Sequence, residues 1–282
     1  MDSNQIIKII CDTHVHIFDY FDWEQMLDSA FLNFKNAASS FNDNLPFVGV
    51  LFLTEDHNQN WFVKHSSKGS SGKSISKLKS WNIRSTQEEC ALIVEKNSYE
   101  RIFIIAGKQI NTLESLEVLA LATTKQIQNG NPIRETISEI LSVGGIPVLP
   151  WGFGKWLGKR GKVISQILNE SKQSRNIFLG DNGGRPSFWR NPSHFKQAEK
   201  LRIQILPGSD PLAFSWEVNK PGCYGFCVNA HFDSNFPSKK IKKILFDPEA
   251  KLYSYGKLEN PIRSIINQLL IQLKKSKILC LN

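Results

Sequence analysis

The sequence predicts an α/β protein, a distorted (βα)7-type barrel that resembles a TIM barrel. Seven short apolar segments of strand length recur along the 282 residues, and segments with helical periodicity alternate with several of them. Strands that alternate with helices form parallel βα units. Because these strands are apolar on both faces, they are expected to be buried on both sides, as in a barrel.

The first strand is expected at residues 6–11, and it ends in the sequence DTHVH. Side chains alternate between the two faces of a strand, so His14 and His16 should project from the same face. At the C-terminal mouth of a parallel barrel this face points to the axis, where such enzymes carry their chemistry. Two adjacent imidazoles provide half of a divalent-metal site. The alternative is a pair of polar residues that merely ends a strand.

Periodicity and helix-start signals predict the elements that follow. Apolar residues at helical spacing indicate a helix over 23–34 and another around 163–168. Asn131-Pro132 and Asn191-Pro192 are typical helix starts, with Asn as the cap and Pro in the first turn. The six further strands are expected at 47–54, 101–110, 115–122, 146–151, 176–182 and 202–210.

Two regions do not follow the alternation. Residues from about 61 to 97 are rich in Ser and Lys and then apolar, which indicates an insertion in the barrel domain (1–236). It is expected to form a loop and a hairpin above the barrel mouth, and the loop is either a lid or an ordinary surface loop. Residues 237–282 form a basic extension that ends in an amphipathic helix, expected to pack on the outside of the barrel. Its apolar stripe consists of Ile262, Ile265, Ile266, Leu269, Leu270 and Leu273.

Composition favours a cytoplasmic protein with reduced thiols. The sequence has no apolar segment of membrane-spanning length and no signal-peptide pattern at its start, and its five cysteines form no disulfide or zinc framework. The formal net charge of +9 comes from lysine runs that lack interleaved aromatic residues. We therefore expect a small anionic substrate as the partner, rather than nucleic acid or a membrane. The oligomeric state is left open.

Several potential metal ligands lie at or near strand ends: His57 after the second strand, Glu117 in the fourth and Asp210 after the seventh. In chain order, DTHVH, LTEDHN, AGKQI, ISEILSVGGIPVLPW and PGSDPL resemble motifs of the polymerase and histidinol phosphatase (PHP) family of metal-dependent phosphoesterases. They match its HxH, TDH, GxE, helix–GG–strand–HP and GSDxH motifs, over residues 7–212.

Three positions depart from the family pattern. Gln109 stands where the family has Glu, Leu149 where it has the His before Pro, and Leu212 where it has the final His. A three-metal cluster is therefore not expected. The resemblance implies one or two metal ions. Imidazole and carboxylate ligands suit Zn, Mn or Fe, whereas magnesium prefers oxygen ligands alone. The expected ligands are His14, His16, His57 and Asp210, with Glu117 as a bridge.

These residues also have structural interpretations. Asp210 before Pro211 is the pattern of a helix N-cap, and His57 in a polar loop could face solvent. Glu117 lies between apolar residues, and a buried carboxylate needs a partner. The other histidines, which show no spacing relationship, are expected at the surface: His65, His194 and His231.

Glycine-rich segments with basic residues follow the fifth and sixth strands. WGFGKWLGKRG supplies Lys155 and Arg160, and GDNGGRP supplies Asp181 and Arg185. Glycine lets the backbone approach an anion, and arginine offers a bidentate fork for phosphate or carboxylate, so these segments predict an anion-binding rim. The alternative for GDNGGRP is a tight turn with Asp181 in an Asx turn.

The sequence thus predicts a hydrolase that uses metal-activated water on a phosphate ester or another small anion. In this hypothesis Lys155 stabilises developing charge, Asp181 is the general acid or base, and Arg160, Arg185 and Gln109 bind substrate. One alternative is a barrel that has lost catalysis and binds an anionic ligand. Another is a carboxamide or lactone hydrolase of amidohydrolase type, although the histidines typical at the ends of strands five and six are lacking.

Overall fold

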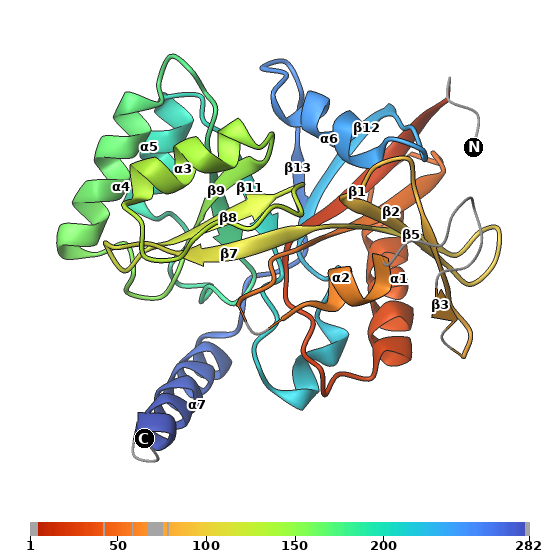
Figure 1. The fold of residues 1–282 in the computed structure, drawn as a ribbon, viewed down its shortest axis with the longest axis horizontal. Helices are drawn as coiled ribbons and strands as arrows, with labels where there is room; N and C mark the ends of the chain where they lie inside the picture. The colour runs from red at the N-terminus through yellow and green to blue at the C-terminus, as the bar shows by residue number, and fades with distance from the viewer. Residues whose placement is uncertain (1–4, 42, 58, 67–75, 78, 280–282) are drawn as a thin grey trace.

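The computed structural model describes residues 5–41, 43–57, 59–66, 76–77 and 79–279. Within these ranges the chain forms two β-sheets with helices around them (Figure 1). The strands are β1 (Ile6–Val15), β2 (Phe47–Leu53), β3 (Ser76–Lys77), β4 (Asn82–Ser85), β5 (Ala91–Glu95), β6 (Arg101–Ile105), β7 (Gly107–Asn111), β8 (Glu117–Leu121), β9 (Ile146–Pro150), β10 (Phe178–Asn182), β11 (Ile205–Gly208), β12 (Gly225–His231) and β13 (Tyr253–Tyr255). The helices are α1 (Trp23–Ser39), α2 (Trp61–Ser66), α3 (Ile133–Ser142), α4 (Gly158–Glu170), α5 (Ser193–Lys200), α6 (Pro237–Leu245), α7 (Pro261–Leu279) and the 3-10 helix η1 (Ser215–Asn219).

Both sheets are mixed. The larger sheet has the order β13-β12-β1-β2-β6-β5-β4-β3, and β1, β2 and β6 within it are parallel. The smaller sheet has the order β11-β10-β9-β8-β7, and β9, β10 and β11 within it are parallel. The sheets meet where β11 lies beside β1: the Thr13 hydroxyl donates to the carbonyl of Pro207, and the Asp210 N–H donates to the carbonyl of His14.

The prediction of a (βα)7-type barrel is wrong, although the chain is an α/β protein. Among the described residues the two sheets do not close into a barrel. The run 101–110 is interrupted at Ala106, so that β6 joins the larger sheet and β7 the smaller one. The chain then returns from β7 directly into the antiparallel β8, without a helix. A short turn joins antiparallel strands, whereas a parallel pair needs a long crossover.

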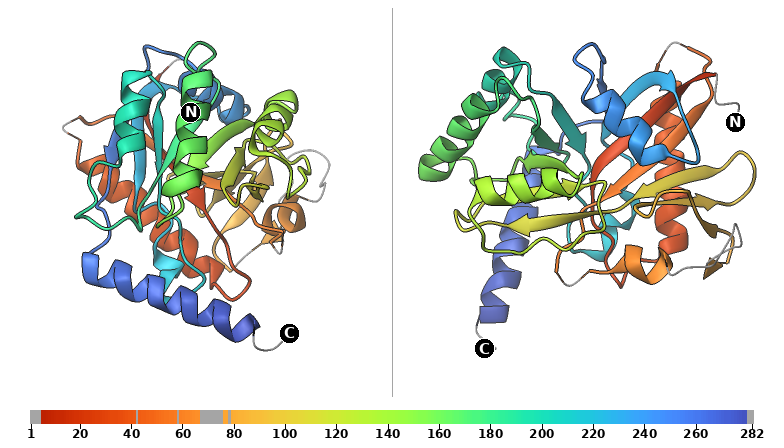
Figure 2. Two further views of the ribbon diagram at one scale, coloured as in Figure 1. Left: turned by 90° about the vertical axis from the view of Figure 1, so that its left-hand side faces the viewer. Right: turned by 45° about the horizontal axis from the view of Figure 1, so that its top comes forward.

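The core has an inner layer between the sheets and an outer layer under the helices. Ile9, Phe103 and Leu206 belong to the inner layer, to which both sheets contribute. Helix α1 covers the larger sheet with residues such as Phe34, and α3, α4 and α5 cover the smaller one (Figure 2). Burial on both faces explains why these strands read as continuous apolar runs.

Helix starts differ in detail from the sequence prediction. The N-cap residue of α3 is Pro132 rather than Asn131, and it makes no side-chain capping hydrogen bond. The Ile133 N–H instead donates to the Glu114 carboxylate, at 3.0 and 3.1 Å. Helix α5 likewise begins after Pro192. A remote carboxylate can therefore satisfy a helix N-terminus that local sequence assigns to Asn.

Helix α7 contacts the rest of the protein with the face opposite to the one expected. Its apolar stripe is largely exposed, with Ile262 at 70% and Leu269 at 59%, whereas Ser264 and Asn267 are buried. In Figures 1 and 2 the helix runs along one side of the molecule, away from the strands. None of the described helices is both long and apolar enough to span a membrane.

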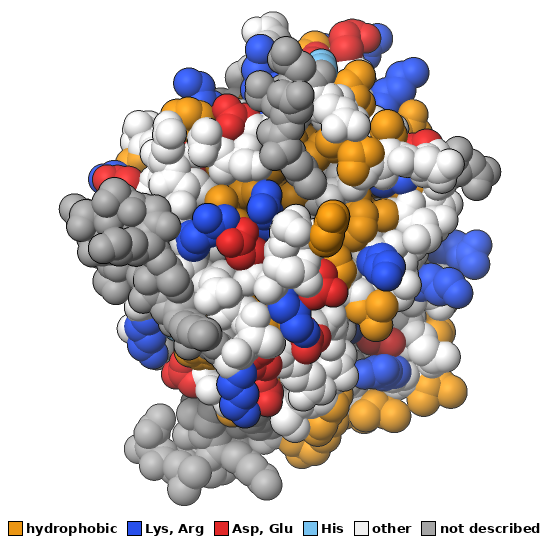
Figure 3. Space-filling model, turned by 90° about the vertical axis from the view of Figure 1, so that its right-hand side faces the viewer, with side chains coloured by type: hydrophobic (Ala, Val, Ile, Leu, Met, Phe, Trp, Pro, Cys, Tyr) orange, Lys and Arg blue, Asp and Glu red, His pale blue; other side chains and the backbone are white. Residues whose placement is uncertain are grey.

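The predicted insertion contains α2 and the antiparallel strands β3, β4 and β5. These strands extend the larger sheet beyond β6. The Ser- and Lys-rich segment predicted as a lid or loop lies mostly outside the described residues. Figure 3 shows one face of the molecule, where Lys and Arg side chains are scattered among uncharged side chains and several Asp and Glu side chains.

Candidate metal centre

Three side chains with metal-ligand atoms meet where β1 and β11 end. His14 Nε2 lies 3.2 Å from His16 Nε2, and Asp210 Oδ1 lies 3.4 Å and 3.6 Å from these two nitrogens. Together they form a group whose ligand atoms all lie within 4.8 Å of one another. Tetrahedral ligands about 2.1 Å from a cation are roughly 3.4 Å apart. The three atoms are therefore spaced to share one divalent cation.

The local fold brings β1 against the segment after β11. The buried carboxylate of Asp12 accepts hydrogen bonds from the N–H groups of His14, Ser209 and Gly222, at 3.2, 2.8 and 2.7 Å. Gly208 lies so close to β1 that a Cβ there would be 2.4 Å from the His14 nitrogen. Only glycine permits this approach. Burial raises the pKa of Asp12 to about 7, although these hydrogen bonds oppose the shift.

Asp210 is not a helix N-cap. The next helix, η1, begins only at Ser215, and Asp210 itself adopts a left-handed backbone with φ of 46°. Asp is one of the few residues other than glycine that tolerates this region. The Asn182 amide donates a hydrogen bond to Asp210 Oδ2, which leaves Oδ1 directed at the two imidazoles. The interpretation of Asp210 as a cap is therefore excluded.

The electrostatics of the group suit metal ligation. Burial lowers the pKa of the His14 imidazole, which favours its neutral form. Burial alone would raise the pKa of Asp210, but the His14 and His16 rings together with the Lys220 and Lys155 cations outweigh this effect and hold that pKa below its usual value. Neutral imidazole and ionised carboxylate are the forms that bind metal.

The structure does not bring His57 into this group. His57 is exposed in the turn after β2, whereas Glu55 before it points inward and accepts a hydrogen bond from the Phe62 N–H at 2.7 Å. The residue from this loop that reaches the histidine pair is Gln59, whose Oε1 lies 3.4 Å from His16 Nδ1. Sequence reasoning missed Gln59, since an amide carries no metal-ligand signal.

Glu117 has the partner that an inward carboxylate requires, and this partner is a lysine. Lys155 forms an ion pair with Glu117, and both line the cavity that His14 and Asp210 also line. Arg160 lines the same cavity and donates to the carbonyls of Ser115 and Gly154, at 3.4 and 3.1 Å. Two cations thus lie beside the candidate metal centre.

Asp181 and Arg185 are committed to each other instead. They form a buried bidentate ion pair with two distances of 2.7 Å, and the Tyr224 hydroxyl donates to Asp181 Oδ2 at 2.6 Å. Arg185 also donates to the carbonyl of Arg190 at 3.0 Å. Neither side chain is among the described residues that line the cavity, so this geometry does not support an acid–base role for Asp181 or a substrate clamp at Arg185.

The turn in GDNGGRP is centred on a different residue from the one expected. Asn182 Oδ1 accepts a hydrogen bond from the Gly184 N–H two residues later, at 2.6 Å, which is the Asx turn that we assigned to Asp181. Gln109, predicted to bind substrate, is half-buried on β7. It is not among the described residues that line the cavity.

The cavity beside the three ligands has a volume of about 330 Å³, and helix α7 forms one of its walls. Its lining comprises His14, Glu117, Trp151, Gly152, Phe153, Lys155, Arg160, Asn182, Gly184, Asp210, Leu212, Ser264, Asn267, Gln268, Ile271 and Gln272. Sequence reasoning missed the α7 residues because it considered only the apolar stripe of that helix. The polar residues at 264, 267 and 268 were the available signal.

Two of the three histidines expected at the surface are buried. His65 Nδ1 lies 2.7 Å from the Trp61 carbonyl, with the two rings stacked, and His194 Nε2 lies 2.9 Å from the Gly161 carbonyl. Their own backbone partners satisfy them, which is the usual condition for a buried polar side chain. His231 is exposed, as expected.

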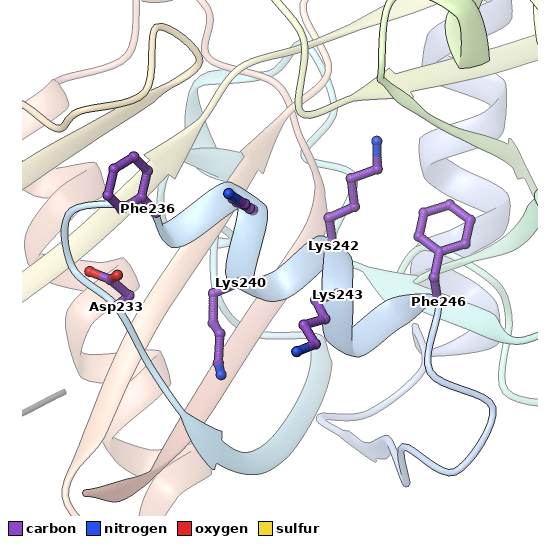
Figure 4. A pocket seen from close by; sticks show the side chains of 7 residues that line it. Asp233, Phe236, Lys240, Lys242, Lys243 and Phe246 are labelled. Atoms are coloured by element: carbon purple, nitrogen blue, oxygen red, sulfur yellow. The ribbon is translucent and has the colours of Figure 1, made fainter. Parts of the chain in front are cut away.

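A larger hollow of about 630 Å³ lies over α6 (Figure 4). Four lysines line it, together with Asp233, Phe236 and Phe246. Lys239 lies over the Phe236 ring and Lys242 over the Phe246 ring, each 5.9 Å from the ring centre. The described lining contains one acidic residue and no histidine or cysteine, so it offers no group of metal ligands.

Comparison with known proteins leaves the family open. No protein-family model matches the chain, and no curated protein matches it. Among solved structures, PsfC from Pseudomonas syringae PB-5123 is similar with a TM-score of 0.58 and 13% identity, over 95% of this chain and 99% of PsfC. A likeness at this identity shows that the fold is shared.

A two-domain protein from Bacteroides vulgatus ATCC 8482, described as containing a predicted PHP-like metal-dependent phosphoesterase, is less similar. It matches with a TM-score of 0.43 and 12% identity, over 89% of this chain and 66% of that protein. At this degree of overlap the likeness carries no argument about function.

Proposed function

We propose that this protein is a metal-dependent hydrolase of small phosphate esters, with one divalent cation held by His14, His16 and Asp210. The observation that carries the proposal is the triangle of ligand atoms, with sides of 3.2, 3.4 and 3.6 Å, beside a cavity. Three protein ligands with a remaining open position are typical of catalytic rather than structural metal sites.

The donor set favours Zn²⁺, Mn²⁺ or Fe²⁺, because two imidazoles are poor ligands for magnesium. When bound, such a cation supplies an activated water near neutral pH and stabilises developing negative charge. Asn182 orients Asp210 through its amide, and Gln59 lies next to the remaining nitrogen of His16. Such outer contacts fix the direction in which ligands point.

Lys155 and Arg160 give this cavity its preference for an anion. Both are cations on the cavity wall, where they can bind phosphoryl oxygens and stabilise the charge that develops during ester cleavage. The ion pair between Lys155 and Glu117 also favours one metal ion rather than two. Glu117 would have to give up this cation to bridge a second metal.

Metal analysis combined with a panel of phosphate esters tests the proposal. We expect purified protein loaded with Mn²⁺ or Zn²⁺ to hold about one ion per chain and to hydrolyse at least one ester. His14→Ala should lose both properties, while His231→Ala, which removes an exposed imidazole outside the cluster, should keep them. A wild-type protein that neither retains metal nor hydrolyses any ester would overturn the proposal.

Binding of an anionic ligand without turnover is the second candidate function. The Glu117–Lys155 ion pair favours it, because this pair neutralises a carboxylate that a two-metal site would use. In that case phosphate should raise the melting temperature of the protein, and a metal chelator should leave the melting temperature unchanged.

A further inference from the structure

We propose that the inner face of α7 is a binding subsite for hydroxyl groups, so that the preferred substrate is a polyhydroxylated phosphate ester rather than a plain alkyl phosphate. The inference rests on the proposed function, which places the phosphoryl group beside the cation, Lys155 and Arg160. It adds the part of the substrate that lies away from the phosphate.

The subsite consists of Ser264, Asn267 and Gln268 on one face of the helix. Their spacing of three and four residues places them side by side on an α-helix. Ser264 and Asn267 are only 2% and 4% exposed, and all three residues line the cavity that His14 and Asp210 also line. The next position on this face, Ile271, lines the cavity as well.

Hydrophobic burial does not explain this orientation of α7. A surface helix ordinarily turns its apolar stripe toward the core and its polar face toward solvent. Here Ile262, Ile265 and Leu269 are more than half exposed, while the polar stripe faces the protein. The position of the polar side chains on the cavity wall, rather than burial of the apolar stripe, therefore distinguishes this orientation.

Asn267 is the residue that points most directly to a ligand. Ser264 donates to the Gly184 carbonyl at 3.2 Å, but the Asn267 amide makes no hydrogen bond with any residue that the structure describes. Asn267 is only 4% exposed, and its amide reaches the cavity with its donors and acceptor not used by the described residues. Polar groups in such positions are usually satisfied by protein, water or ligand. Because Asn267 lines the cavity, a bound molecule can supply that partner.

The chemistry of the wall defines the class of ligand. A carboxamide offers both donors and acceptors and carries no charge, which matches a hydroxyl group. Trp151 and Phe153 line the same cavity and offer apolar surface for carbon atoms. The volume of about 330 Å³ lies at the lower end of the range of about 300–1,000 Å³ that is typical of small-molecule sites. These features fit one small polyol or sugar phosphate rather than a polymer.

Glycerol phosphate and n-propyl phosphate form a matched pair of probes, because they share a three-carbon chain and differ in hydroxyl groups. We would measure Kd on Mn²⁺-loaded protein by calorimetry, or kcat/KM where an ester is hydrolysed. Two uncharged hydrogen bonds predict a preference of about tenfold for glycerol phosphate. In Asn267→Ala/Gln268→Ala this preference should fall to near parity, with the affinity for inorganic phosphate unchanged.

The control is Ile265→Ala/Leu269→Ala on the outer face of α7, which should keep the preference. Gln268→Ala alone, at a half-buried position, is a milder variant that should reduce the preference if the double variant does not fold. Equal binding of the two esters by the wild type, binding of neither, or a preference that survives in Asn267→Ala/Gln268→Ala would overturn the subsite. Loss of metal binding and hydrolysis would instead overturn the proposed function, whatever the two affinities are.

Discussion

Two clusters of charged side chains lie at the same edge of the strands and differ in how they are satisfied. The first cluster is His14, His16 and Asp210, whose ligand atoms face one another beside a cavity. The second is Asp181, Arg185 and Tyr224, whose members are buried and hydrogen-bonded to each other. The sequence predicted a functional role in both places.

The difference shows what separates a site from a structural ion pair. Arg185 donates to both oxygens of Asp181, so the charges of this pair are compensated inside the protein. In the metal-centre cluster, the described polar contacts of the two imidazoles are with each other, with Asp210 and with Gln59. None of these contacts is a bidentate ion pair, so the ligand atoms can still bind a cation. Burial and charge alone do not distinguish the two cases, whereas the remaining ligand capacity does.

The largest expected effect is on the second cluster. Arg185→Leu removes the partner of a buried carboxylate, and breaking a buried ion pair in this way costs about 3–5 kcal/mol of unfolding free energy. Denaturant unfolding measures it. Arg190→Leu, in the same loop but exposed, should change stability by less than about 0.5 kcal/mol. Equal stability of the two variants would mean that Arg185 is not a structural residue.

A smaller effect is expected on the first cluster from Asn182→Ala. This variant removes the amide that orients Asp210, and loss of such outer contacts weakens metal binding about 10- to 100-fold. Competition with a fluorescent chelator measures the affinity. Tyr224→Phe, which removes a hydrogen bond to Asp181 in the other cluster, should leave metal affinity unchanged. An equal loss of metal affinity in both variants would show that the two clusters are energetically coupled.

Tyr224→Phe should in turn lower stability by about 1 kcal/mol, the usual net contribution of one hydrogen bond. The Tyr224 hydroxyl is the third partner of the Asp181–Arg185 pair, and burial raises its pKa, so it is a neutral donor at ordinary pH. Denaturant unfolding of both variants, Tyr224→Phe and Arg185→Leu, compares the free energy of unfolding that each contact contributes. A loss as large as that of Arg185→Leu contradicts this ranking.

Local features could be predicted from the sequence better than long-range ones. The HxH spacing predicted that His14 and His16 lie side by side, and their Nε2 atoms are 3.2 Å apart at the end of β1. The apolar patterns located α1 and β2. The division of 101–110 between two sheets depends on what lies beside Ala106, which no local pattern records. The spacing of four residues between Asp181 and Arg185 was a signal of mutual pairing that we interpreted as an anion site.

The helix α7 shows a second limit of sequence reasoning. Its apolar stripe predicts burial by the ordinary rule for surface helices. In the structure this stripe faces outward, while Asn267 and Ser264 line the cavity and Arg263 lies 3.5 Å from Glu217. A stripe pattern states which residues share a face, and it does not state which face meets the protein.

The smallest expected effect concerns an ion pair at the start of β1, of which one member is buried and the other is partly exposed. Lys8 is buried and lies 2.7 Å from Asp43 Oδ1, but the Asp43 side chain is 35% exposed. The hydrogen bond from Lys8 holds the pKa of Asp43 below its ordinary value of 3.8. A depressed carboxylate pKa stabilises the fold above the ordinary value, and this stabilisation is lost as the pH falls through the lowered one.

The expected result is a difference in melting temperature between wild type and Asp43→Asn that is largest near neutral pH and shrinks as the pH falls below 3.8. Asparagine cannot ionise, so the variant lacks this part of the acid dependence. Thermal unfolding of both proteins across the acid range measures it. A difference that is the same at every pH would show that Asp43 contributes through shape or hydrogen bonding alone, and that its charge is screened as in an exposed pair.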